Sequence, residues 1–269
     1  MAGETRPGTG SEKVGTSWRA SVEGFSQTAE NYVISMAPSL RTMAVRVVQR
    51  AQLGAGERIL DCGTGTGIGA AAALSSGRQV VGVDAAPGML AVARREVPGA
   101  RFIQADYSQL PFSRASFDVV ISVHALHFSP DPAATLAEWR RVTRPEGRLS
   151  LSVPGPRAAL SFKIYDPIYR KHGVYRRVEV PSKAKLLAWA RAAGWQHPVV
   201  EADSATTIRL AGPETFGAWL RTGSRAVATG GLGAVRLAAL EADLLAATPV
   251  AADGLLHIPF GTLYLSARN

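Results

Sequence analysis

Strand-like and helix-like segments alternate through the middle of the sequence, and this alternation restricts the possible folds more than any other feature. The strand-like segments are short and apolar, and lie at residues 58–61, 79–84, 101–105, 117–123 and 147–153. Helical spacing of apolar residues separates several of them, at residues 68–74, 87–96 and 132–142. Strands joined by single helices pair in parallel and take helices on both faces, so the pattern predicts a doubly wound α/β sheet.

The segments outside this region divide the rest of the chain. We expect a disordered tail at residues 1–16, a helical cap at 17–54, the α/β core at 55–155, and the remainder of the sheet with inserted lid helices at 156–269. In the cap, apolar spacing predicts a helix that starts at an N-cap Ser39 and stops at Gly54. In the last part, we expect helices at 182–194, 213–220 and 233–246, and strands at 199–210 and 257–267.

A glycine-rich loop connects the first strand of the core to the following helix. The segment ILDCGTGTG (59–67) places Gly63, Gly65 and Gly67 between the two elements. Glycine permits a tight turn and lets a ligand approach the backbone amides, and the helix N-terminus adds donors. The register of Gly65, Gly67 and Ala70 also fits the dinucleotide fingerprint. The loop by itself therefore leaves a nicotinamide-dependent dehydrogenase open.

Acidic residues follow the next two strands. Asp84 comes 23 residues after Asp61, where a carboxylate can accept hydrogen bonds from both ribose hydroxyls. Asp106 follows the third strand and could accept from an adenine amine, and Met89 could lie against the adenine face. Each of these residues could equally be a loop cap or a core residue. Together, they indicate an adenosine ligand with a free ribose.

The combined motifs resemble the class I S-adenosylmethionine-dependent methyltransferases, particularly the small-molecule branch that is similar to the quinone-biosynthesis methyltransferases. The resemblance rests on ILDCGTGTG (59–67), VVGVDAAPGML (80–90), FIQADYSQLPF (102–112), FDVVISVHALHFSPDP (117–132) and RVTRPEGRLSLSVP (141–154). It implies a Rossmann-like, mostly parallel seven-stranded sheet, S-adenosyl-L-methionine as cofactor, and methyl transfer to an O, N or C nucleophile of a small-molecule acceptor.

The resemblance also implies which residues hold the cofactor. They are Tyr32, Asp61, Gly63, Thr64, Gly65, Gly67, Asp84, Ala85, Met89, Ala105, Asp106, Tyr107, Val123 and His124. Two positions depart from the pattern of the family. Phe128 stands where a second histidine is frequent, and Glu146 stands where glycine is usual.

Candidate residues for catalysis and acceptor binding are fewer. His124 and His127 follow the fourth strand, where either could act as a base or position the acceptor. Trp18, Phe25, Tyr165 and Tyr169 are candidates for acceptor binding, and Tyr175 lies in the same inserted region. The remaining histidines show no metal-ligand spacing and Cys62 is the single cysteine, so we predict no metal site.

Charge and hydropathy narrow the alternatives. The net charge is +9, and residues 151–200 carry 9 basic and 2 acidic side chains, a local excess of +7. Such a patch keeps an RNA methyltransferase open, and a non-catalytic ligand-binding subunit is a further alternative. No run of 18 apolar residues occurs and the first residues contain no apolar stretch, so we expect a cytoplasmic protein that does not enter the membrane. The oligomeric state stays open.

Overall fold

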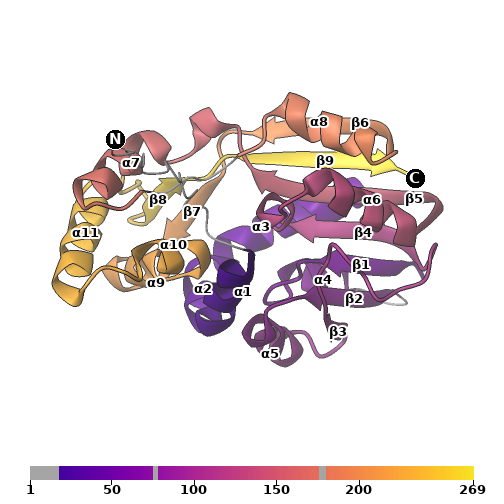
Figure 1. The fold of residues 1–269 in the computed structure, drawn as a ribbon, viewed down its shortest axis with the longest axis horizontal. Coiled ribbons are helices and arrows are strands. Elements are labelled where there is room, and N and C mark those ends of the chain that lie inside the picture. The colour runs from indigo at the N-terminus through magenta and orange to yellow at the C-terminus, as the bar shows by residue number, and fades with distance from the viewer. Residues whose placement is uncertain (1–17, 75–77, 176–179) are drawn as a thin grey trace, which may run out of the picture.

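A seven-stranded sheet forms the centre of the protein in a computed structural model that describes residues 18–74, 78–175 and 180–269 (Figure 1). Its strand order is β3-β2-β1-β4-β5-β9-β6, and β9 runs antiparallel to both of its neighbours. The strands are β1 (Arg58–Cys62), β2 (Gln79–Asp84), β3 (Arg101–Gln104), β4 (Phe117–Val123), β5 (Thr143–Pro154), β6 (Gln196–Asp203) and β9 (Thr262–Arg268). The predicted mostly parallel, doubly wound sheet is confirmed.

Helices cover both faces of this sheet because side chains alternate along each strand. Ile59 of β1 packs with α3 and α4, whereas its neighbour Leu60 belongs to the cluster that includes α6 and α8. The helices of this core and its cap are α1 (Trp18–Gln27), α2 (Ala29–Ser35), α3 (Ala37–Ala51), α4 (Ile68–Ala73), α5 (Pro87–Glu96), α6 (Pro132–Val142) and α8 (Lys183–Ala192). A short 3-10 helix, Leu126–Phe128, follows β4.

A second apolar cluster lies beside the main sheet, on the left of Figure 1. It contains a two-stranded sheet of β7 (Thr207–Leu210) and β8 (Leu256–Pro259). The helices around it are α7 (Phe162–Lys171), α9 (Pro213–Leu220), α10 (Gly223–Thr229) and α11 (Ala234–Ala246). Met36, Leu40 and Met43 join this cluster to the start of α3. Two apolar cores therefore face each other across the region where the parallel strands end.

The structure corrects the two long strands expected near the end of the chain. The predicted strand at 199–210 is divided into β6 and β7, and the predicted strand at 257–267 into β8 and β9. The two breaks lie side by side. The amide of Phe260, between β8 and β9, donates to the carbonyl of Thr206, between β6 and β7, at 3.0 Å. The neighbouring strand β5 ends there at Pro154, and the next proline, Pro156, has no amide to continue the ladder. Beyond that point, the β7–β8 pair leaves the main sheet.

The start and end of the α3 helix also differ from the expectation. The helix begins at Ala37, two residues before Ser39, and ends where Gln52 takes a left-handed conformation (φ 50°), before Gly54. Pro38 lies in the first turn, where its missing amide costs nothing. The Ser39 hydroxyl accepts a hydrogen bond from the Arg209 amide at 2.9 Å and thereby ties β7 to α3.

Helices α7 and α10 have no counterpart among the sequence predictions. Pro167 inside α7 and the glycines at both ends of α10 hide their helical character. The predicted tail at 1–16 and the basic residues Arg176 and Arg177 lie outside the described residues.

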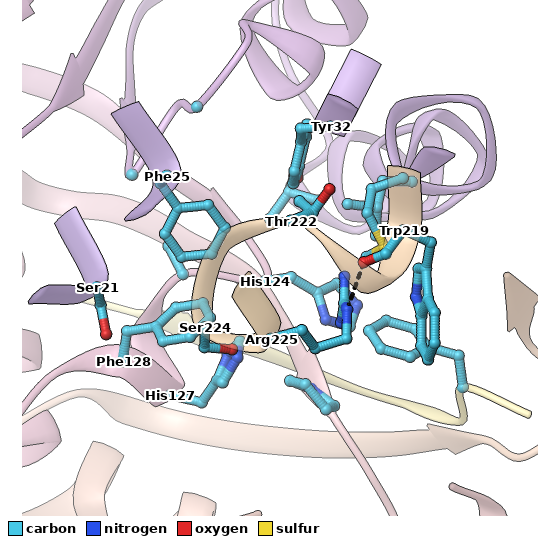
Figure 2. A pocket seen from close by; sticks show the side chains of 18 of the residues that line it. Ser21, Phe25, Tyr32, His124, His127, Phe128, Trp219, Thr222, Ser224 and Arg225 are labelled. Atoms are coloured by element: carbon cyan, nitrogen blue, oxygen red, sulfur yellow. Dashed lines mark hydrogen bonds between the residues drawn. The ribbon is translucent and has the colours of Figure 1, made fainter. Parts of the chain in front are cut away.

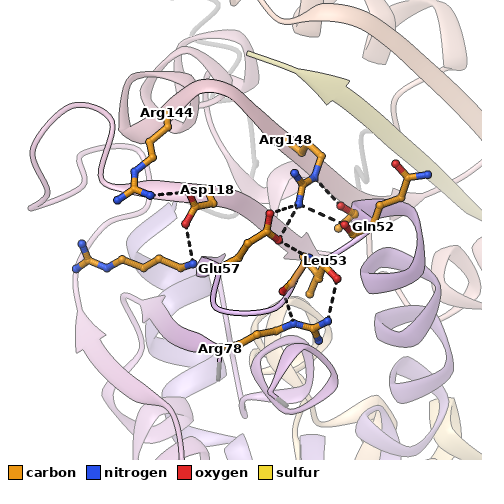
Figure 3. A network of polar contacts seen from close by, with 10 residues as sticks. Gln52, Leu53, Glu57, Arg78, Asp118, Arg144 and Arg148 are labelled. Carbon is orange, nitrogen blue, oxygen red and sulfur yellow. Dashed lines mark hydrogen bonds and ion pairs between the residues drawn. The ribbon is translucent and has the colours of Figure 1, made fainter. Parts of the chain in front are cut away.

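Arginine side chains anchor the loop that precedes β1, at the amino end of the sheet (Figure 3). Arg148 donates to both carboxylate oxygens of Glu57 at 2.7 Å, a two-point pairing that fixes both side chains. Arg78 donates to the carbonyls of Leu53 and Gly54 at 2.9 and 3.0 Å. These contacts hold the end of the sheet that is opposite to the glycine loop.

Candidate active site

A pocket opens at the carboxyl ends of β1, β2 and β4, between the sheet and the helices that cover it (Figure 2). The α/β core contributes Gly63, Gly65, Asp84, Ala86, Met89, Tyr107, Val123, His124, Ala125, His127 and Phe128. The covering segments contribute Trp18, Ser21, Val22, Phe25, Tyr32, Met36, Leu40, Pro154, Leu160, Ser161, Phe162, Tyr165, Asp166, Val180, Trp219, Thr222, Ser224, Arg225, Ile258 and Phe260. This is the edge at which open α/β sheets bind their ligands.

The glycine loop forms one wall of the pocket. Gly65 has φ +54°, and a Cβ atom built on it would meet nothing within 4 Å, because it would project into open space. A Cβ on Gly63 would lie 2.3 Å from the Cβ of Ala125, so the loop is closely packed on its other side. The Thr64 amide donates to the Val83 carbonyl at 2.9 Å and fixes the loop against β2. The loop thus presents backbone to a ligand at Gly65.

The carboxylate of Asp84 lies directly across from this loop. It accepts hydrogen bonds from the Gly65 amide at 2.8 Å and the Ala86 amide at 2.9 Å. Burial raises the pKa of Asp84, and the backbone amides of Ala86, Gly65 and Ala85 oppose that rise. Each carboxylate oxygen retains a lone pair, so the side chain can still accept from two hydroxyl groups of a ligand.

Asp61 lies beneath the loop and is 1% exposed. The Thr64 hydroxyl donates to its Oδ2 at 2.6 Å, while Oδ1 has no hydrogen-bond partner among the described residues. Burial raises the pKa of Asp61 to about 6, against the opposing hydrogen bond from Thr64. Neither Asp61 nor Thr64 lines the pocket, so both residues support the loop from below.

Several residues implied as cofactor ligands stand back from the pocket. Ala85, Ala105 and Asp106 do not line it, and the Asp106 Oδ1 instead accepts from the amide and hydroxyl of Ser108 at 2.8 and 2.7 Å. Gly67 faces the core, where an added Cβ would lie 3.1 Å from Val97. Asp106 therefore caps its own loop in this structure.

Tyr107, in contrast, reaches the pocket. Its hydroxyl donates to the Ala125 carbonyl at 3.2 Å, and its ring meets Trp18 edge-to-face with centroids 5.1 Å apart. Met89 and Tyr32 also line the pocket, and both belong to the contact between α5 and the cap helices. The residues around the glycine loop are therefore covered by α1 and α2.

The two candidate histidines converge on the same wall of the pocket. The centroids of their rings are 6.3 Å apart. The ring centroid of His124 lies 5.1 Å from that of Phe260, and the ring centroid of His127 lies 4.0 Å from that of Phe128. The His124 Nε2 is 3.4 Å from the Thr262 hydroxyl, and Nδ1 of both rings has no partner among the described residues.

Burial keeps both imidazoles neutral. It lowers the pKa of His127 to about 3, and burial together with His127 lowers the pKa of His124 well below its usual value. A base with so low a pKa takes a proton poorly at neutral pH. The geometry favours a positioning role over proton abstraction.

Aromatic residues from the covering segments line the pocket as well. Trp18, Phe25 and Tyr165 line it, as expected for acceptor-binding candidates. Tyr169 is 1% exposed in the apolar cluster of α7, α9 and α11, and Tyr175 is 75% exposed to solvent. Neither of these two tyrosines lines the pocket, since Tyr169 is packed within this cluster and Tyr175 follows the end of α7.

The two departures from the family pattern have different surroundings. Phe128 meets Phe25 edge-to-face at 5.2 Å, so the side chain that replaces a histidine joins the β4 loop to the cap. Glu146 has φ +61°, a backbone conformation that glycine adopts without strain. It is exposed and lies outside the pocket.

Trp219, Arg225 and Phe260 also line the pocket, and the sequence analysis did not identify them. They lie on α9, α10 and the break before β9. No sequence motif marks these positions. The feature that could have indicated Trp219 and Arg225 is the polar and aromatic composition of the segment 213–225.

The cap helices are fastened over the pocket at three points. The Gly88 amide donates to the Ser26 hydroxyl at 2.9 Å, and Arg95 donates to Glu30 at 2.9 Å. On the other side, the Gly223 amide donates to the Thr28 hydroxyl at 3.0 Å. These bonds link α1 and α2 to both α5 and α10.

The described residues contain neither a membrane-spanning helix nor a cluster of metal ligands. None of their helices combines the length and apolar character needed to cross a membrane. No group of three histidine, cysteine or acidic side chains within them is arranged to hold a metal ion.

Comparisons with known proteins identify relatives of this chain. Residues 60–151 match the family model "Methyltransferase domain". The demethylmenaquinone methyltransferase of Clavibacter sepedonicus is 34% identical over 170 residues, which cover 62% of this chain and 64% of that protein. The trans-aconitate 2-methyltransferase of Methylobacterium nodulans is 30% identical over 245 residues, which cover 84% of this chain and 92% of that protein.

A solved structure shows the same fold. Phosphoethanolamine N-methyltransferase 2 of Haemonchus contortus, which was solved with S-adenosylhomocysteine, has a TM-score of 0.55 at 19% identity, over 85% of this chain and 52% of that chain. The chain spans about half to two thirds of the length of the demethylmenaquinone methyltransferases that it matches. The match over nearly the whole trans-aconitate 2-methyltransferase decides the family: the chain belongs to the S-adenosylmethionine-dependent methyltransferases.

Proposed function

We propose that the protein transfers the methyl group of S-adenosylmethionine to a small-molecule acceptor. The observation that carries this proposal is one continuous pocket that Gly65 and Asp84 line together with aromatic side chains of the covering segments. Relatives named for demethylmenaquinone and trans-aconitate support a small molecule as the acceptor. The sulfonium of the cofactor, when bound, supplies an electrophilic methyl carbon, so alignment and exclusion of water are the main tasks of the protein.

The residues of the core divide the binding of the cofactor between them. Asp84 accepts hydrogen bonds from the ribose, and Met89 and Ala86 lie against the adenine. Gly65 offers backbone to the amino-acid part, and the buried Asp61 supplies a compensating negative charge below it. The open space at Gly65 and the burial of Asp61 beneath the loop support this assignment.

In this proposal, residues 55–155 hold the cofactor, and residues 17–54 and 156–269 enclose the acceptor. His124 and His127 orient the acceptor as neutral rings. A neutral wall avoids repulsion of a cationic donor, whereas a protonated histidine there would oppose it. The nucleophile is therefore one that arrives without a proton to lose or releases its proton to solvent.

None of the basic side chains at 151–200 that the structure describes lines this pocket. Arg157, Lys163 and Arg170, for example, are not among the residues that line it. Arg157 lies over the Phe162 ring at 4.3 Å and Lys171 pairs with Asp243 at 2.8 Å. This arrangement favours a small acceptor over RNA. We also propose a cytoplasmic location, with which the free, buried Cys62 is compatible.

Calorimetry with S-adenosylhomocysteine and with NAD tests the cofactor. We expect binding of the first and none of the second, and the reverse result would contradict the proposal. Transfer of a labelled methyl group into fractions of a cell extract then tests the acceptor. Label in the low-molecular-weight fraction supports a small molecule, and label confined to the RNA fraction refutes it.

A further inference from the structure

His124 directly follows β4, and its backbone has a conformation that residues other than glycine rarely adopt. Its φ is +53°, in the left-handed region. Its amide donates to the Ser152 carbonyl at 3.0 Å and so holds it against the neighbouring strand β5. The side chain lines the pocket and is 7% exposed (Figure 2). Strained backbone of this kind persists only where the surroundings hold it, so the fold itself determines the position of the imidazole.

One ring nitrogen of His124 meets the hydroxyl of Thr262, the first residue of β9. The distance between His124 Nε2 and Thr262 Oγ1 is 3.4 Å. The same hydroxyl oxygen lies 3.3 Å from the carbonyl oxygen of Phe260 and 3.7 Å from the sulfur of Met43. Thr262 is fully buried and does not line the pocket. The carbonyl oxygen and the sulfur can only accept a hydrogen bond, whereas Nε2 of a neutral imidazole can either donate or accept.

The neutral ring of His124 carries one proton, and its hydrogen bonds decide which nitrogen holds it. If Nε2 holds the proton, Nε2 donates to the Thr262 hydroxyl, and that hydroxyl donates onward to the Phe260 carbonyl. If Nδ1 holds the proton, the hydroxyl donates to Nε2, and a buried N–H at Nδ1 lacks an acceptor among the described residues. A buried donor without an acceptor is costly, so the surroundings favour the proton on Nε2.

The other ring nitrogen, Nδ1, then presents a lone pair. It is buried and has no hydrogen-bond partner among the described residues. Because the two nitrogens lie on different edges of the ring, a ring whose Nε2 is directed at Thr262 turns Nδ1 away from β9. A lone pair on a side chain that lines the pocket is satisfied by a hydrogen-bond donor of the ligand, and a carboxylate or an ether oxygen cannot provide one.

We propose that Thr262 holds His124 as the Nε2–H tautomer and that Nδ1 of His124 accepts a hydrogen bond from an O–H or N–H nucleophile of the acceptor. This inference rests on the proposed methyl transfer and adds that the methylated atom still carries a proton when it binds. The buried ring is too weak a base to take that proton, so the hydrogen bond positions the nucleophile. The proton leaves to water once the nucleophile has formed its bond to the methyl carbon. Thr262 is a positioning residue that acts through His124.

Nitrogen-15 NMR of the labelled protein without any ligand tests the tautomer, because protonated and unprotonated ring nitrogens have well-separated chemical shifts. His124→Asn assigns the signals, since asparagine tolerates the left-handed backbone. We expect a protonated Nε2 in the unmodified protein and in Thr262→Ser, and a mixture of both tautomers in Thr262→Val. Thr143→Val is the matched control, because the buried Thr143 hydroxyl donates to the Trp139 carbonyl at 2.7 Å, away from the pocket lining. A protonated Nδ1, or a tautomer that Thr262→Val leaves unchanged, would overturn the role of Thr262.

Paired probes test the hydrogen bond in the protein saturated with S-adenosylhomocysteine. Phenols and anilines are compared by calorimetry with the analogues in which fluorine replaces the hydroxyl or amino group. We expect the hydroxyl or the amino probes to bind roughly two- to tenfold more tightly than their fluorinated partners and to shift the Nδ1 resonance of His124. The class that shows the preference distinguishes an oxygen from a nitrogen nucleophile. Thr262→Val should reduce the preference, and Thr262→Ser should retain it.

Two results would overturn the hydrogen bond at His124. One is equal affinity within every pair, including no binding of any hydroxyl or amino probe, and the other is a shift confined to the resonances of His127. Absence of S-adenosylhomocysteine binding to the unmodified protein would instead refute the methyl transfer, and the tautomer measured without ligand does not depend on that result. Circular dichroism confirms that each variant is folded.

Discussion

The Asp84 carboxylate accepts a hydrogen bond from the Gly65 amide at 2.8 Å, and this contact joins the end of β2 to the glycine loop after β1. A second bond from the Ala86 amide holds the other carboxylate oxygen. The side chain is thus oriented before any ligand arrives. Such preorganisation lowers the entropic cost of binding.

Replacing Asp84 with asparagine should weaken S-adenosylhomocysteine binding by about 1–3 kcal/mol, because the amide loses the charge that strengthens hydrogen bonds to hydroxyl groups. Isothermal calorimetry measures the change. Asp131→Asn is the control, since Asp131 caps α6 away from the pocket and asparagine caps helices equally well. An unchanged affinity in Asp84→Asn would show that Asp84 does not bind the ribose.

Substitution of Gly65 by valine should eliminate cofactor binding, because the side chain would fill the open space above the loop. Gly56→Val separates this effect from backbone strain. Gly56 has φ +73° and nothing within 4 Å of an added Cβ, but it lies outside the pocket. Both variants should lose about 1–2 kcal/mol of stability from the left-handed backbone. Equal cofactor affinities in the two variants would show that the loop is not the binding wall.

The neutral His127 predicts a specific pH dependence of stability. Its pKa is about 3 in the folded protein, compared with about 6.5 for an unperturbed histidine. As pH falls from about 6.5, the unfolded chain gains a proton that the folded chain rejects, so this residue lowers stability by about 1.4 kcal/mol per pH unit. His127→Gln should remove that contribution in urea unfolding at several pH values.

The exposed His197 supplies the comparison for this experiment. His197→Gln makes the same chemical change at a position where the imidazole is not buried, and shows what the substitution alone does to stability. If His127→Gln and the unmodified protein lose stability in parallel on acidification, His127 is not held neutral by burial.

Enlarging Gly88 should loosen the cap. A Cβ at this position would lie 2.1 Å from the Ser26 carbonyl oxygen, so Gly88→Ala must push α1 away from α5. We expect faster dissociation of S-adenosylhomocysteine in stopped-flow measurements, because α1 covers the ligand. Gly99→Ala is the control, since its Cβ would meet only the tip of the Leu74 side chain, which can move. Identical dissociation rates would mean that the cap does not control exit.

The α/β core could be predicted because its signals are local. Apolar runs identified β1, β2 and β4, and the spacing after β1 located the loop at Gly65 and the acid at Asp84. Parallel strands place their carboxyl ends at one edge, so residues distant in sequence are predicted to meet there. The same logic does not apply to residues 156–269, where the break before β9 falls at the end of the neighbouring strand β5.

The sequence by itself determined the family, the parallel core and the position of the loop with its acidic partner, because each depends on residue types at fixed short spacings. Tertiary packing decided which side chains line the pocket. Tyr169 turns into the apolar cluster, while Trp219 and Arg225 reach the pocket. Helices that are apolar on more than one side can bury either one, and the choice follows from the surfaces that surround them. A periodic pattern within a single helix does not contain that information.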